Sequence, residues 1–153
     1  MPRRIRTLTG LGAVLALTVA LSGCNALRDQ VSGPPRDENG VAIVRVVKDA
    51  VLEALPDAVD VSTLVRLDGF ANTMSLTVTL PDDAVLDVAT VQTGARAVCE
   101  HVTGYDSMEY GFYQADGRID LTELWPAAFP GVGRVDRSTA DFWEDDCAAI
   151  LAG

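Results

Sequence analysis

The sequence predicts a single α+β domain in which a four-stranded antiparallel sheet carries helices on one face. Three observations lead to this class. Apolar and polar residues alternate strictly over residues 74–80, apolar residues recur at helical spacing in two longer segments, and turn residues separate these stretches. With 153 residues, 48% hydrophobic and 22% charged, the chain has the composition of a globular protein. The expected order of elements is α-β-β-α-β-β-α.

A first helix is predicted from a cap at Asp37 or Asn39 to about Leu55. Its apolar side chains are spaced for one helical face: Val44, Val47, Val51 and Leu55. Pro56 then ends the helix. Because valine mildly disfavours helix, a strand is the alternative, but the length and the period favour helix.

A β-hairpin follows, formed by residues 61–67 and 74–80 around the turn residues Asp68, Gly69 and Asn72. A second helix is predicted to open at Pro81 and to end near Gly104. Its apolar positions step by three and four residues: Ala84, Val88, Val91, Ala95, Val98 and Val102.

The last third of the chain predicts a second hairpin and a third helix. Residues 108–114 and 118–125 flank Asp116-Gly117, the strongest short-range hairpin signal. Residues 126–137, rich in proline and glycine, form an irregular connection. Ser138 or Thr139 then caps a last helix, whose apolar face is Ala140, Trp143, Cys147 and Ile150.

The first 23 residues predict a secretory signal peptide. Arg3, Arg4 and Arg6 form a basic start, and the following stretch to Leu21 is uncharged and mostly apolar. That stretch of about 15 residues is shorter than the roughly 20 that a membrane span needs. Removing 23 residues from 153 leaves 130, the size of one domain.

The end of this segment, Leu21-Ser22-Gly23-Cys24, resembles a bacterial lipobox. The resemblance implies cleavage before Cys24, a diacylglycerol and acyl lipid on Cys24, and a location on the extracytoplasmic side of the cell membrane. Lys48 is the one lysine among 12 basic residues, and alanine, valine, glycine and aspartate are abundant. Together with the lipobox this composition resembles the small lipoproteins of actinobacteria, many of which have no known function. An ordinary signal with Cys24 in a disulfide is the alternative.

Residues 24–38 are then expected to be a flexible tether, because Ser32-Gly33-Pro34-Pro35 interrupts any apolar period. Residues 39–153 form the single domain. If Cys24 carries lipid, Cys99 and Cys147 remain as an even pair, and we expect a disulfide in an oxidising compartment. Two buried free thiols are the alternative.

The charge of the chain excludes one class of partner. The mature chain keeps 9 basic residues against 22 acidic ones, because three arginines leave with the signal. The resulting negative net charge repels nucleic acid, so no nucleic-acid partner is expected.

No catalytic or metal-binding constellation is visible in the sequence. His101 is the only histidine and has no partner for a catalytic dyad. Residues 116–120 resemble a calcium loop only faintly, since Arg118 stands where an acid is needed. The acids of residues 144–146 fit a solvated helix face. No catalytic residue, metal or cofactor is therefore predicted, apart from the lipid on Cys24.

The open face of the predicted sheet is the candidate partner surface. By alternation it should carry Leu64, Arg66, Thr77, Tyr113 and Leu124. Arginine and aromatic residues are enriched at interfaces, although an ordinary solvated face fits as well. The main hypothesis is a membrane-anchored, non-catalytic module that binds an envelope protein. The alternative is a small envelope enzyme or ligand-binding protein that uses acidic residues near the 126–137 segment.

Overall fold

One mixed β-sheet organises the part of the chain that the computed structural model describes, residues 33–68 and 71–153. The predicted signal peptide, Cys24 and most of the predicted tether lie outside the described residues. The elements follow in this order: α2 (Ile43–Ala54), β1 (Asp60–Asp68), β2 (Ala71–Thr79), α3 (Val88–His101), β3 (Ser107–Gln114), β4 (Gly117–Arg118), α4 (Leu124–Ala128), β5 (Arg134–Asp136), β6 (Thr139–Trp143), the 3-10 turn η1 (Glu144–Asp146) and α5 (Cys147–Ala152).

The strand order is β1-β2-β3-β6-β5, with the short β4 beside β3. The α+β class is confirmed, but the four-stranded antiparallel sheet is wrong. β2 and β3 run parallel, with Thr73 opposite Ser107 and Thr79 opposite Tyr113. The reason is α3, which returns the chain from the end of β2 to the start of β3, as a crossover between parallel strands requires. The other neighbouring strands are antiparallel.

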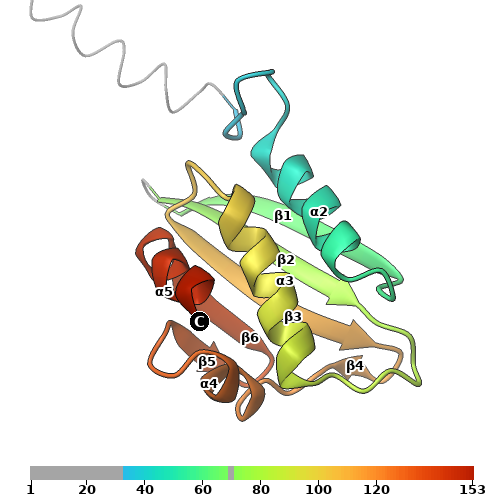
Figure 1. The fold of residues 1–153 in the computed structure, drawn as a ribbon. Helices are drawn as coiled ribbons and strands as arrows, with labels where there is room; N and C mark the ends of the chain where they lie inside the picture. Colours follow the sequence, from blue (N-terminus) through green and yellow to red (C-terminus); the bar gives the residue numbers. More distant parts are fainter. Residues whose placement is uncertain (1–32, 69–70) are drawn as a thin grey trace, which may run out of the picture. The chain divides into compact units, whose positions relative to one another are not determined.

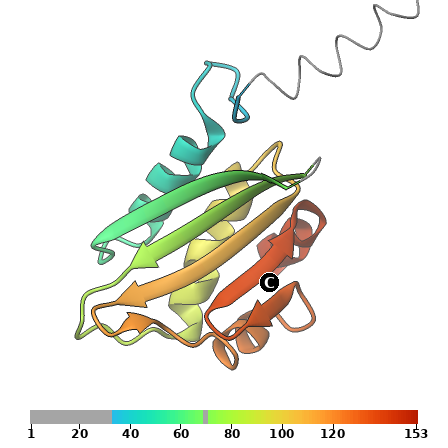
Figure 2. The same cartoon turned by 180° about the vertical axis from the view of Figure 1, so that it is seen from behind.

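The helices cover one face of the sheet. In Figure 1, α2, α3 and α5 lie in front of the strands, and in Figure 2, seen from behind, the strands lie in front of the helices. α3 is the central helix of this layer and contacts α2, α4 and α5. The opposite face of the sheet carries no helix from the described residues.

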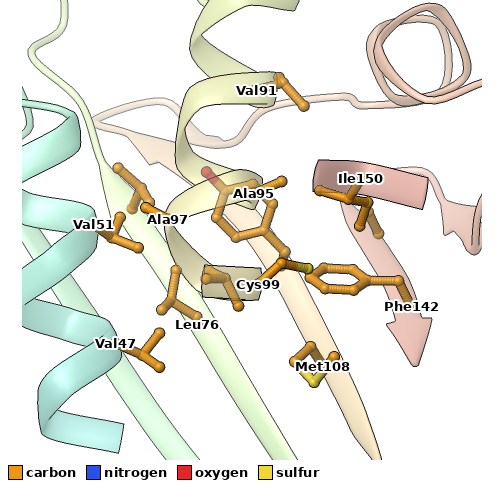
Figure 3. Packing of buried hydrophobic residues seen from close by; sticks show 14 of the residues in the cluster. Val47, Val51, Leu76, Val91, Ala95, Ala97, Cys99, Met108, Phe142 and Ile150 are labelled. Carbon is orange, nitrogen blue, oxygen red and sulfur yellow. The ribbon is translucent and has the colours of Figure 1, made fainter. Parts of the chain in front are cut away.

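The core lies between the sheet and this helical layer. Along β2, the side chains of Met74, Leu76 and Val78 are buried, as the alternating pattern predicts. Val47 and Val51 of α2 face them from the helical side (Figure 3). The helix predicted for this valine-rich segment is confirmed, because tertiary packing outweighs the mild helix penalty of valine. Its predicted start is wrong: the N-cap position is Ala42, and neither Asp37 nor Asn39 caps the helix.

The second helix begins later than predicted. Asp87 is its N-cap, and the side chain of Asp87 accepts a hydrogen bond from the backbone N–H of Thr90 at 2.8 Å. Pro81 and Asp82 lie in the preceding loop and bind the β3–β4 turn instead. The carbonyl of Pro81 accepts from Nε2 of Gln114, and the carboxylate of Asp82 accepts from the N–H of Ala115.

The predicted second hairpin forms only at its turn. β3 occupies the expected positions, but β4 has two residues, and the chain then leaves the sheet. Leu121 and Trp125 are buried in the core, where the Trp125 ring stacks on that of Phe142. The indole N–H of Trp125 donates to the carbonyl of Val132 at 2.9 Å. Burial of this large ring, with its polar atom satisfied, replaces strand pairing.

The predicted last helix is wrong over its first half. Residues 139–143 form β6 between β3 and β5, and helix α5 begins only at Cys147. Ala140 and Phe142 are buried while Asp141 and Trp143 point to the other face, which is the period of a strand. Trp143 consequently lies on the surface and not in the core.

The disulfide is confirmed. Cys99 of α3 and Cys147 at the start of α5 are bonded, with their Cα atoms 5.1 Å apart. The bond closes a loop of 48 residues in sequence separation. The chain-entropy model gives roughly 4 kcal/mol of stabilisation for a loop of this length. α5, with six residues, is held on α3 by this bond and by burial of Ile150.

A close approach between α3 and β3 depends on a glycine. A Cβ atom at Gly94 would lie 1.9 Å from the hydroxyl oxygen of Tyr110 and 3.0 Å from Leu55. The Tyr110 hydroxyl is buried and makes no hydrogen bond to any described residue. Gly94 therefore sets the distance between the central helix and the central strand.

We expect Gly94→Ala to lower the free energy of unfolding by about 2 kcal/mol or more, because the added methyl overfills this contact. In a Tyr110→Phe background the loss should be clearly smaller, since the atom at 1.9 Å is gone. Tyr110→Phe alone should change stability little. Urea denaturation of the four chains measures the coupling. An equal cost of Gly94→Ala in both backgrounds would contradict this account.

Candidate functional site

The outward side chains of β1, β2, β3 and β6 form a surface that no helix of residues 33–68 and 71–153 covers, here called the open face. Figure 2 shows the strands from this side, with the helices behind them. Four of the five residues predicted for the open face line one hollow there: Leu64, Arg66, Thr77 and Tyr113. Leu124 does not belong to it. That residue begins α4 and packs, half-buried, against the core, because the strand predicted for this segment does not form.

The hollow has a volume of about 350 Å³. It lies over the centre of the sheet, where Thr77, Gly111 and Thr139 are register partners on three neighbouring strands. Small side chains keep this floor low. A Cβ atom at Gly111 would lie 3.0 Å from the backbone oxygen of Ser138, so glycine allows the chain before β6 to approach closely. Further lining residues are Ser62, Thr63, Ser75, Leu76, Glu109, Phe112 and Arg118.

Glu109 is the fixed negative charge of the hollow. One of its carboxylate oxygens accepts a hydrogen bond from the guanidinium of Arg66, and the other accepts from the hydroxyl of Ser75. Burial opposes the charge, but these two bonds and the positive charge of Arg66 outweigh burial and lower the pKa of Glu109. Glu109 is therefore ionised at neutral pH, and its carboxylate is bonded to Arg66 of β1 and Ser75 of β2.

Two arginine–aromatic pairs lie on the open face. The guanidinium carbon of Arg118 is 5.7 Å from the ring centroid of Tyr113, and Arg118 also donates to the Thr139 hydroxyl at 3.1 Å. The guanidinium carbon of Arg134 is 5.1 Å from the ring centroid of Trp143. Tyr113 and Trp143 are 37% and 39% exposed. Each stacked guanidinium presents its ring as a rigid apolar contact with a cation beside it.

Sequence reasoning missed four residues of this face: Glu109, Arg118, Arg134 and Trp143. Glu109 lies between the buried Met108 and Tyr110, so the alternation along β3 already indicated that its side chain points to the open face. Arg134 and Trp143 reach the face only because residues 134–136 and 139–143 are strands. The helical spacing of Ala140, Trp143 and Cys147 hid that alternation.

Residues 126–137 do not cover the hollow. Ala128 and Phe129 are buried on the helical side, and the carbonyl of Ala128 accepts a hydrogen bond from Gln92 of α3 at 2.9 Å. Residues 134–136 continue the sheet as β5. A second hollow, of about 300 Å³, lies elsewhere, between the end of α2, the loop after β2 and the start of α3.

The other candidates from the sequence lie apart from the open-face hollow. His101 is exposed at the last position of α3. Residues 115–116 form the β3–β4 turn, and the carboxylate of Asp120 accepts from the N–H and the hydroxyl of Thr122. Within residues 33–68 and 71–153, no three histidine, cysteine or acidic side chains gather as a metal site would require. Over the same residues, no helix has the length and apolar character to cross a membrane.

Comparison of the chain with protein-family models, with curated proteins and with solved structures found no match.

Asp141, on β6 opposite Glu109, is a half-buried carboxyl whose charge is disfavoured. Burial first, and the negative charge of Glu109 second, raise the pKa of Asp141, while Arg134 partly opposes them. Because the native state holds this proton more tightly than the unfolded state, the contribution of Asp141 to stability rises as the pH falls through its folded-state pKa.

We therefore expect Asp141→Asn to raise the free energy of unfolding at neutral pH, by less than about 1 kcal/mol because solvent screens a partly exposed charge. The gain over the wild type should shrink as the pH falls through the folded-state pKa of Asp141. Denaturant unfolding of both chains across this range measures it. A variant less stable than the wild type at neutral pH would show that the charge is stabilising.

Proposed function

We propose that this protein is a lipid-anchored, non-catalytic module on the extracytoplasmic side of the cell membrane, and that its open face binds a protein of the cell envelope. The observation that carries the binding role is the uncovered hollow on the sheet, between Arg66 on one side and the Tyr113–Arg118 pair on the other. The lipobox resemblance at residues 21–24 supports the anchor.

The composition of the open face supports protein contact. Tyrosine, tryptophan and arginine are enriched where protein surfaces meet, and two such pairs stand here on a rigid sheet. Hydroxyl groups of Ser62, Ser75 and Thr77 line the floor between them and offer donors and acceptors to a partner backbone. Such a surface fits a polar segment with aliphatic or aromatic anchors.

The electrostatics of the hollow also support binding. Glu109 is held ionised by Arg66 and Ser75, which suits a fixed charge that a partner complements and not a group that exchanges protons. The alternative hypothesis placed acidic residues of the 126–137 segment in a pocket. In that segment Phe129 is buried in the core and Arg134 is part of strand β5, and neither residue lines the open-face hollow. We therefore propose the open face as the binding site.

We expect Cys24→Ala to move the protein from the membrane fraction to the soluble or secreted fraction of an actinobacterial host, because the thiol that would carry the lipid is lost. Ser32→Ala, in the predicted tether, is the matched control and should fractionate like the wild type. Immunoblots of separated fractions provide the measurement. If the wild type is no more membrane-bound than Cys24→Ala, the anchor is refuted.

We expect a photo-crosslinking amino acid at position 77, on the floor of the hollow, to give a discrete adduct with another envelope protein in living cells. The same probe at position 53, on the exposed side of α2, is the control. Adding Arg118→Glu and Tyr113→Ala should abolish the position-77 adduct, because these changes remove the stacked pair beside the hollow.

Mass spectrometry of the adducts identifies the partner. Identical adducts from positions 77 and 53, or an adduct that survives the double substitution, would exclude the open face as the binding site.

A further inference from the structure

Strand β1 forms one border of the sheet (Figure 1). Its nine residues pair with β2 on one side, and in the described part of the chain no other strand pairs with it. An unpaired strand edge presents a row of N–H and C=O groups that can accept another strand. β5, at the opposite border, has three residues and offers a much shorter edge.

Large apolar side chains gather along β1. Val59, just before the strand, is 66% exposed, and Leu64 and Leu67 within it are 57% and 54% exposed. Edge strands normally carry protective charges or prolines, because exposed apolar edges invite pairing. The charged residues of β1 are Asp60, Arg66 and Asp68. Asp60 and Arg66 have opposite signs and lie six residues apart.

The sequence of β1 is self-complementary about Thr63. If two copies pair antiparallel with Thr63 on the two-fold axis, Asp60 lies opposite Arg66 of the second copy. In the same register Val61 meets Val65, Ser62 meets Leu64, and Val59 meets Leu67. Each pairing joins residues whose side chains point to the same face of the sheet, as an antiparallel register requires.

We propose that two copies of this chain associate through their β1 edges in this register, forming one continuous sheet. The two Asp60–Arg66 contacts supply charge complementarity, and the exposed valine and leucine side chains are covered. Arg66 keeps its bond to Glu109, because a guanidinium has five N–H donors. Asp60 already accepts from Lys48 at 3.3 Å, and its carboxylate has further acceptor sites. The dimer is reversible, because an edge contact buries little area.

Charge reversal tests the pairing. Asp60→Arg places two arginines opposite each other at both contacts, and Arg66→Asp places two aspartates there, so each variant alone should be monomeric. Mixed together, the two variants should form a heterodimer, because every contact then joins opposite charges. Sedimentation velocity of the full chain in detergent, with one variant fluorescently labelled, measures all three states. Arg45→Asp, on exposed α2, is the control and should dimerise like the wild type.

Heterodimer formation also shows that both variants are folded. The proposal is overturned if the wild type sediments as a monomer at every soluble concentration, if either single variant still dimerises, or if the mixture stays monomeric. The register has its own test: Thr63→Cys should form an intermolecular disulfide under oxidation, whereas Val65→Cys should not. The reverse result would exclude the Thr63 axis.

Discussion

The packing of α3 across the sheet is the contact on which the rest of the structure depends. Gly94 lets this helix approach Tyr110 of β3 closely, and Cys99 binds α5 covalently to it. Gln92 holds the end of α4 through the Ala128 carbonyl, and α2 packs along its other side. One helix thus positions all the others, and the connection through it makes β2 and β3 parallel.

Because every described helix contributes to that single layer, the other face of the sheet is left to its own side chains. Short hydroxyl side chains and Gly111 occupy its centre, and longer charged or aromatic side chains stand around them. The hollow is therefore a result of residue size on a regular sheet, and it needs no loop to shape it. Ion pairing fixes Glu109 in place, which gives this surface a defined charge pattern before any partner arrives.

Local patterns predicted the first two-thirds of the fold well, because in these segments the sequence period and the structure agree. The alternation of Met74, Leu76 and Val78 is that of a strand buried on one face, and α3 carries a continuous apolar face. The secondary-structure prediction for residues 118–143 failed for a physical reason. Burial of Trp125 and pairing of β6 with β3 are long-range interactions. They override the local strand signal of residues 118–125 and the helix-cap signal of Ser138. The site shows the same division: the residues predicted on β1, β2 and β3 lie on the open face, although Glu109 of β3 was missed. Leu124 was misplaced, and Trp143 was assigned to the core.

The strand order also bears on how the chain reaches its native state. β1 and β2 form a hairpin of neighbours in sequence, but the parallel pair joins Thr73 to Ser107, and β6 returns from Trp143 to Ser107. Each of these two pairings must bring together segments more than thirty residues apart in sequence. The entropy lost in closing these loops opposes folding before the strand contacts can stabilise the chain. Folding is accordingly slower than for a helical bundle of this size. The central strand β3 makes both of its long pairings with segments far from it in the chain, β2 before it and β6 after it.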